Sequence, residues 1–301
     1  MRSLPASFIP RTISTVGLWL AIFIVFWTKC ETAFLLLIAF PAVGVLWEYF
    51  ALLKSGGIAR HRGMGLTAAL ILIGLNFWLL RYPGMAFPLS QGGGGIFAID
   101  AAVLSLLVIV LFLREFGRHE PGLPTAQAIV FTLFGVIYIP WLFLFVAKLL
   151  YLTPRDGQGC TTGQYLVLFV IAVTKFTDVG AFLCGSLLGK TPFFPNISPK
   201  KTCEGIVGGV ALGILVGVMI FHFLGSHLPP FSLGLVCGLS LLLAVAGVAG
   251  DLAESLLKRS VHTKDSGHAL PGIGGGLDLI DSLLFTLPLF YFVLQFLLPH
   301  S

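Results

Sequence analysis

The sequence predicts an all-α fold, a polytopic bundle of about nine transmembrane helices with a cytoplasmic N-terminus, and two observations lead to this prediction. First, 57% of the 301 residues are hydrophobic and only 10% are charged, whereas a soluble domain carries about 25% charged residues. Second, the apolar residues form runs of the length that a bilayer demands, about 20 residues per helix. A chain with so little polar surface has lipid as its main solvent.

Apolar runs between polar or Gly/Pro segments give the candidate spans. The first resembles a signal peptide, but no small-x-small cleavage site follows it, so we interpret it as a retained span. The sixth contains Lys175 and Asp178, and the ninth starts from a polar turn with Asp278 and Asp281. The predicted spans are 13–29, 32–53, 64–82, 96–113, 126–150, 163–188, 205–225, 232–250 and 280–298.

The basic residues predict the orientation, because loops on the cytoplasmic side are enriched in Lys and Arg. With nine spans and the N-terminus inside, four basic residues fall outside: Lys29, Arg81, Lys148 and Arg155. The other fourteen fall on the cytoplasmic side: Arg2, Arg11, Lys54, Arg60, Arg62, Arg114, Arg118, Lys175, Lys190, Lys200, Lys201, Lys258, Arg259 and Lys264. We therefore expect an integral protein of the cytoplasmic membrane, with its C-terminus outside.

Several function classes are disfavoured. The formal charge of +5 comes from scattered Lys and Arg without a basic stripe or stacking aromatics, so we expect no nucleic-acid partner. The five cysteines form no C-x-x-C pair and the seven histidines show no metal-type spacing. No Ser-His-Asp set, haem site or Walker-type P-loop is present.

The acidic residues are concentrated near the C-terminal end. Seven of the thirteen follow position 177: Asp178, Glu204, Asp251, Glu254, Asp265, Asp278 and Asp281. A charge at the centre of a membrane helix costs at least roughly 2.5 kcal/mol. These acids are therefore expected in a water-filled cavity or at helix ends, on the cytoplasmic side.

The segment 250–282 has the composition of a magnesium–nucleotide site. Asp251, Glu254 and Lys258 are spaced to share one face of a helix, and Asp278 and Asp281 are spaced to share a face of the next. The glycine run 271–276 between them would let backbone N–H groups approach a phosphate. Taken singly, a glycine run is more often a turn and an Asp more often a helix cap; the combination favours a functional site.

The segment 175–209 is a second candidate. Asp178 follows Lys175 by three residues, and the two charges neutralise each other in the simpler interpretation. Ser198, Lys200 and Lys201 precede a predicted helix start, which suits a phosphate or a lipid head group. A plain basic cytoplasmic loop is the alternative.

Both segments resemble the phosphatidate cytidylyltransferase (CDP-diacylglycerol synthase) family. The long C-terminal family signature is matched in register by Ser255, Lys258, Arg259, Lys264, Asp265, Gly267, Leu270, Pro271, Gly274, Gly275, Asp278, Ile280 and Asp281. Upstream, Asp178, Gly180, Ala181, Phe182 and the run 198–209 match a second family pattern. We therefore expect N-terminal membrane helices over 1–150 and a C-terminal membrane domain carrying the signature over 151–301.

The chain also departs from the family pattern. Ile273 stands where the signature has His, Leu279 where it has Arg, and Ser186 where an upstream motif frequently has Arg. The changes at Ile273 and Leu279 remove a His and an Arg, and with them hydrogen-bond donors, near the expected triphosphate. The acidic and basic sets remain, which favours retained activity.

The resemblance implies a nucleotidyltransferase that converts phosphatidate and CTP to CDP-diacylglycerol and pyrophosphate for phospholipid synthesis. The residues it implies as catalytic are Asp251, Lys258, Asp278 and Asp281, of which the three Asp would bind Mg²⁺. Those it implies for substrate binding are Asp178, Ser198, Lys200, Lys201, Ser255, Arg259, Lys264, Asp265, Gly274 and Gly275. A second cation and a homodimer are left open. The alternatives are a CTP-dependent prenol or dolichol kinase and a non-catalytic membrane paralogue.

Overall fold

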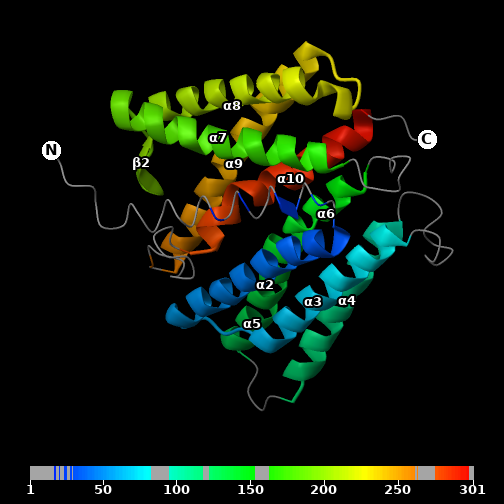
Figure 1. Ribbon diagram of the computed structural model, residues 1–301. Coiled ribbons are helices and arrows are strands. Elements are labelled where there is room, and N and C mark those ends of the chain that lie inside the picture. Colours follow the sequence, from blue (N-terminus) through cyan, green and yellow to red (C-terminus); the bar gives the residue numbers. More distant parts are fainter. Residues whose placement is uncertain are drawn as a thin grey trace. The chain divides into compact units, whose positions relative to one another are not determined.

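The computed structural model describes residues 17, 20, 24, 25, 28, 30–82, 95–117, 122–152, 163–261, 263 and 275–297 (Figure 1). Within these residues the chain is almost entirely helical, which confirms the all-α prediction. Eight helices are long and apolar enough to cross a membrane. Most of the first predicted span, 13–29, lies outside the described residues, and its five described residues are helical.

The membrane-length helices follow the predicted spans closely. They are α2 (Glu31–Ser55), α3 (Arg62–Arg81), α4 (Gly95–Glu115), α5 (Leu123–Val136) continued by η3 (Ile137–Trp141) and α6 (Phe145–Leu150), α7 (Gln164–Leu188), α8 (Cys203–Leu224), α9 (Leu233–Ser260) and α10 (Leu277–Leu297). A short helix, η4 (Gly225–His227), follows α8, and two short strands, β1 (Pro192–Phe194) and β2 (Ser198–Thr202), lie between α7 and α8.

Two differences from the predicted spans have local causes. The span predicted as 126–150 is interrupted by a π-helical turn at Ile137–Trp141, which contains Pro140. Proline has no backbone N–H and cannot continue the regular helical hydrogen-bond ladder. The span predicted to end at 250 continues to Ser260, because the polar residues that follow 250 remain helical.

The described chain divides into two compact units. The first comprises 1–147 and 261–279, and the second comprises 148–260 and 280–301. The division into an N-terminal region, 1–150, and a C-terminal domain, 151–301, stays a prediction.

In the first unit, α3 packs against α2, α4 and α5. Three polar contacts, which are buried or partly buried, link these helices. The Asp100 carboxylate accepts hydrogen bonds from Asn76 Nδ2 at 2.7 Å and Trp141 Nε1 at 2.9 Å. His61 Nε2 lies 2.5 Å from Glu115 Oε1. Since an unsatisfied polar group is costly in an apolar environment, these pairings tie α3, α4 and η3 together.

In the second unit, α7 and α8 lie side by side (Figure 1) and α9 packs against both. The buried residues of α8 are glycines at every fourth position: Gly205, Gly209, Gly213 and Gly217. A Cβ on Gly209 would lie 2.6 Å from the Thr177 carbonyl oxygen of α7. Small residues at this spacing let membrane helices approach at backbone distance, and this contact places the parts of α7 and α8 that belong to the segment 175–209 next to each other.

Candidate active site

Helix α9 carries three charged residues of the site. Asp251, Glu254 and Lys258 lie on its C-terminal part, and Asp251 is well inside the helix. Asp251 is therefore not a helix cap, which removes the simpler interpretation of this residue. Spacings of three, four and seven residues place the three side chains on one side of the helix.

A glycine brings α9 into contact with α10. A Cβ on Gly250 would lie 2.7 Å from the Asp281 carbonyl oxygen and 3.0 Å from the Ser282 Cα. Any larger residue would push the two helices apart. Because Gly250 immediately precedes Asp251, this close crossing brings the Asp251 carboxylate near that of Asp281.

The result is a group of three carboxylates. One oxygen from each of Asp251, Glu254 and Asp281 lies within 4.8 Å of the other two. Glu254 and Asp281 are buried, with relative exposures of 1% and 5%, and Asp251 is half-buried. Clustered carboxylate oxygens suit a hard divalent cation such as Mg²⁺, so this donor set fits the ion that the sequence predicts.

Lysines surround these carboxylates. Lys201 Nζ lies 2.6 Å from Asp251 Oδ2, and Lys258 Nζ lies 2.9 Å from Glu254 Oε1. Lys175 Nζ lies 3.4 Å from Asp178 Oδ2 and 4.0 Å from Asp281 Oδ1. The pairing of Lys175 with Asp178 is the one considered from the sequence, and the contact with Asp281 extends it to the carboxylate group.

A serine hydroxyl connects Asp178 to the same group. Ser282 Oγ lies 3.3 Å from both Asp178 Oδ2 and Asp281 Oδ1. Asp178 of α7 and Asp281 of α10 are thus bridged twice, by Ser282 and by Lys175. These bridges fix the orientation of two acids that come from helices about a hundred residues apart in the sequence.

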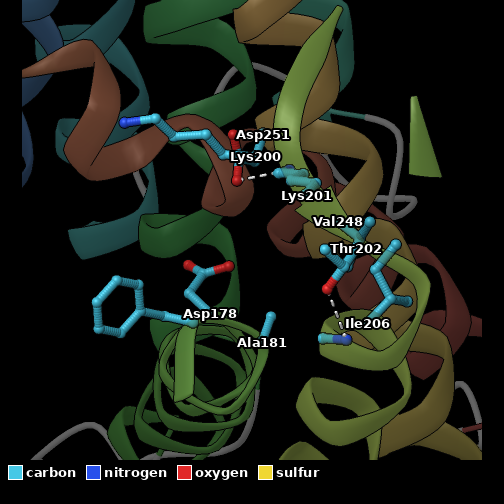
Figure 2. Close-up of a pocket in the computed structure, with 10 residues that line it drawn as sticks. Asp178, Ala181, Lys200, Lys201, Thr202, Ile206, Val248 and Asp251 are labelled. Atoms are coloured by element: carbon cyan, nitrogen blue, oxygen red, sulfur yellow. Dashed lines mark hydrogen bonds and ion pairs between the residues drawn. The ribbon is translucent and has the colours of Figure 1, made fainter. Parts of the chain in front are cut away.

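A pocket of about 220 Å³ opens beside these acids. Figure 2 shows Lys201 directed across it to Asp251, with Asp178 on the neighbouring wall. Charged, polar and apolar side chains together line the pocket. Its lining comprises Asp178, Ala181, Phe182, Lys200, Lys201, Thr202, Gly205, Ile206, Val248 and Asp251.

The β1–β2 hairpin carries Lys200 and Lys201 at the pocket, and hydrogen bonds attach both of its ends to the start of α8. Thr202 Oγ1 accepts a hydrogen bond from the Gly205 N–H and so caps α8. The Glu204 carboxylate accepts hydrogen bonds from the Lys190 N–H at 3.1 Å and the Thr191 N–H at 3.2 Å. Because both ends of the hairpin are anchored to the start of α8, the backbone of Lys201 is fixed.

The remaining predicted site residues have different positions. Asp278 lies in the first turn of α10, belongs to the first unit, and accepts a hydrogen bond from the Gly275 N–H at 3.1 Å. Ser198 lies on β2, and Ser255 and Arg259 lie on the C-terminal part of α9. Lys264, Asp265 and Gly274 lie outside the described residues. The metal role of Asp278 and the substrate roles of this set stay predictions.

Three contributing residues were not assigned to the site from the sequence. For Glu254 the sequence did contain an indication, because its spacing from Asp251 places it on the same helical face. Lys175 had only its proximity to Asp178, and Ser282 had no signal beyond its position next to Asp281. The contacts of these two residues depend on how α7 and α10 pack.

Known proteins share extensive similarity with this chain. The model of the cytidylyltransferase family matches residues 9–297. A phosphatidate cytidylyltransferase of Bacillus subtilis is 37% identical over 240 residues, 79% of this chain and 82% of that protein.

Other relatives align over shorter stretches. The uncharacterized protein YnbB of Escherichia coli is 36% identical over 184 residues, 60% of this chain. A phosphatidate cytidylyltransferase of Staphylococcus haemolyticus is 38% identical over 159 residues, 53% of this chain. The chain spans 57% and 56% of these two proteins, less than two thirds of either.

Proposed function

Because this chain belongs to the cytidylyltransferase family, we propose that it transfers a cytidylyl group from CTP to phosphatidate, giving CDP-diacylglycerol and pyrophosphate. The observation that carries the proposal is the group of Asp251, Glu254 and Asp281 with its lysines, next to a pocket lined by both charged and apolar side chains. The name of the Bacillus subtilis relative supports the same reaction.

The reaction needs charge neutralisation more than a protein nucleophile. A phosphate oxygen of phosphatidate attacks the α-phosphorus of CTP, a new P–O bond forms, and the bond to the β-phosphate bridging oxygen breaks as pyrophosphate leaves. Negative charge accumulates around the α-phosphorus and on the leaving group, so catalysis depends on positioning and on positive groups. A divalent cation on the carboxylates would supply part of that positive charge.

The residues of this chain have separate tasks in the proposed reaction. Asp251, Glu254 and Asp281 would hold the cation, and Asp278 remains a further ligand predicted from the sequence. Lys258, at 2.9 Å from Glu254, would lie next to the transferring phosphoryl group. Ser282 would keep Asp281 in position through its hydrogen bond, and Asp178 would do so indirectly, through Ser282 and the shared Lys175.

The pocket suits the phosphate end of a lipid. Lys200 and Lys201 provide positive charge, while Phe182, Ile206 and Val248 provide apolar lining. Phe182 itself is 73% exposed on a membrane-length helix, so this part of the apolar lining extends to the outer surface of the helix, where an acyl chain would lie. We propose that the phosphatidate head group binds here, on the cytoplasmic side of the membrane.

The position of the transferred label distinguishes this reaction from its alternatives. The purified protein in detergent is supplied with Mg²⁺ and CTP labelled at either the α- or the γ-phosphate, with phosphatidate or a polyprenol as the acceptor. Cytidylyl transfer labels the lipid product only from α-labelled CTP and only with phosphatidate. A lipid labelled from γ-labelled CTP identifies a kinase, and the absence of any labelled lipid favours a non-catalytic paralogue.

A further inference from the structure

The charges of the candidate active site nearly cancel without any metal. The site holds four carboxylates, Asp178, Asp251, Glu254 and Asp281, and three lysines contact them. Lys175 and Lys258 belong to the same helices as acids that they contact, α7 and α9. Lys201 differs, because it reaches Asp251 of α9 from the β1–β2 hairpin.

A cation on the carboxylate group would compete with Lys201. The Lys201 ammonium occupies Asp251 Oδ2 at 2.6 Å, and Asp251 also contributes an oxygen to the carboxylate group. A divalent ion near that oxygen repels an ammonium at hydrogen-bond distance, because like charges at such separations interact unfavourably. A bound ion therefore weakens the contact between Lys201 and Asp251.

Lys201 has space to move into when it leaves Asp251. Its backbone is fixed by the anchored hairpin, so only the side chain needs to change rotamer. Both Lys201 and Asp251 line the pocket of about 220 Å³, and their side chains are 21% and 33% exposed. A released ammonium would therefore remain in the pocket, where the proposed function places a phosphate.

We infer that Lys201 is an exchangeable counter-ion, which neutralises Asp251 before a divalent cation binds and is transferred to an anionic phosphate when the cation arrives. This inference rests on the proposed function and deepens it. It makes binding of the cation and of the phosphate mutually favourable, because each removes one partner of the Lys201–Asp251 pair and leaves the other available. Reciprocal coupling of this kind follows from linkage.

The first test measures cation binding without turnover. The full chain in detergent is titrated with Mn²⁺, and free Mn²⁺ is followed by its electron paramagnetic resonance signal. Lys201→Met removes the competing ammonium, so the Kd for Mn²⁺ should fall about two- to fivefold, the range for a partly exposed ion pair. Lys190→Met is the matched control: Lys190 is an exposed lysine next to the hairpin that does not line the pocket and, among the described residues, makes no ion pair, so the Kd of this variant should equal that of the wild type.

The second test uses the unmodified protein and does not depend on a variant folding. Lysines are acetylated briefly with acetic anhydride, with and without Mg²⁺, and the modification of each is quantified by mass spectrometry. Release from Asp251 should raise the labelling of Lys201 about two- to fivefold, while Lys200 in the same peptide stays constant.

Unchanged labelling of Lys201, or equal Mn²⁺ affinities of wild type and Lys201→Met, would overturn the inference. Both measurements are independent of catalysis. A wild type that shows the exchange but makes no CDP-lipid would contradict the proposed function alone, and an active wild type without the exchange would contradict this inference alone.

Discussion

At the scale of single residues, the site is defined by acids that are each held by a neighbour. Asp251 and Glu254 each have a lysine, and Asp281 has both Lys175 and the Ser282 hydroxyl. Buried charges need such partners, since an unpaired one would be strongly destabilising. The same partners stabilise this acidic group without a bound cation.

Asp281→Asn should reduce turnover about 100-fold or more, as expected when a charge-stabilising group is removed from the reacting centre. Asparagine keeps the shape and one oxygen but loses the negative charge. The measurement is product formation from α-labelled CTP, together with a thermal unfolding curve in detergent to show that the variant is folded. Glu31→Gln is the control, because Glu31 pairs with Arg81 in the first unit, and its variant should keep wild-type turnover. Activity within tenfold of wild type would remove Asp281 from the cation site.

Leu279→Arg should lower the KM for CTP by about tenfold, because one charge-assisted hydrogen bond contributes about 1.5–3 kcal/mol. Leu279 stands where the resembling family has arginine, and it is half-buried near the start of α10. Steady-state kinetics of wild type, Leu279→Arg and the uncharged control Leu279→Met would test this. A folded but inactive Leu279→Arg would show that the position is reserved for apolar packing in this protein.

At the scale of elements, glycines set the distances between helices. Gly209 determines how closely α8 approaches α7, and Gly250 determines how closely α9 approaches α10. In both cases a Cβ would meet backbone atoms, which cannot rotate away as a side chain can. The helix crossings, and with them the positions of the acids, therefore depend on residues that have no chemistry of their own.

Gly250→Ala should reduce turnover about 100-fold, because a shift of about 1 Å in a reacting group can cost that much. The added methyl would meet the Asp281 carbonyl oxygen and move α10 away from Asp251. Gly238→Ala is the matched control on the same helix, since a Cβ there has no atom within 4 Å. Both variants should be assayed for product formation and for helical content by circular dichroism. Equal turnover in the two variants would show that the α9–α10 crossing tolerates displacement.

At the scale of the whole molecule, the Lys201–Asp251 contact constrains topology. The α7–α8 connection and the C-terminal part of α9 must lie on the same side of the membrane for this pair to form. Two crossings, by α8 and α9, separate these segments, which is consistent with each helix spanning the bilayer once. The distribution of basic residues then predicts that this side is cytoplasmic.

A reporter fused after Ser301 should behave as external, and a reporter inserted at Arg60, between α2 and α3, as cytoplasmic. The expectation follows from the excess of Lys and Arg on one side of the predicted spans. Paired alkaline phosphatase and green fluorescent protein fusions at each position would provide the measurement, since the first is active only outside and the second only inside. If both reporters indicated the same side of the membrane, the number of spans between Arg60 and Ser301 would be even, which would contradict the nine-span prediction.

The sequence by itself determined the class of fold and the neighbourhood of the site. Composition and the lengths of apolar runs predicted membrane helices, because the bilayer imposes a minimum length and excludes charge. Helical spacing placed Asp251, Glu254 and Lys258 on one face, because residues three, four and seven apart share a side of a helix. Both the length of an apolar run and the spacing along a helix are local properties, which depend only on residues close together in the sequence.

Only the tertiary structure decided which of the acids meet and which lysine faces each of them. Asp281 joins Asp251 because the α9–α10 crossing at Gly250 is close, and Lys201 reaches Asp251 because a hairpin is anchored to the start of α8. Such contacts between residues far apart in the chain depend on helix crossing and packing. No spacing within one segment encodes them, which is why Lys175 and Ser282 could be recognised as parts of the site only once the helices were in place.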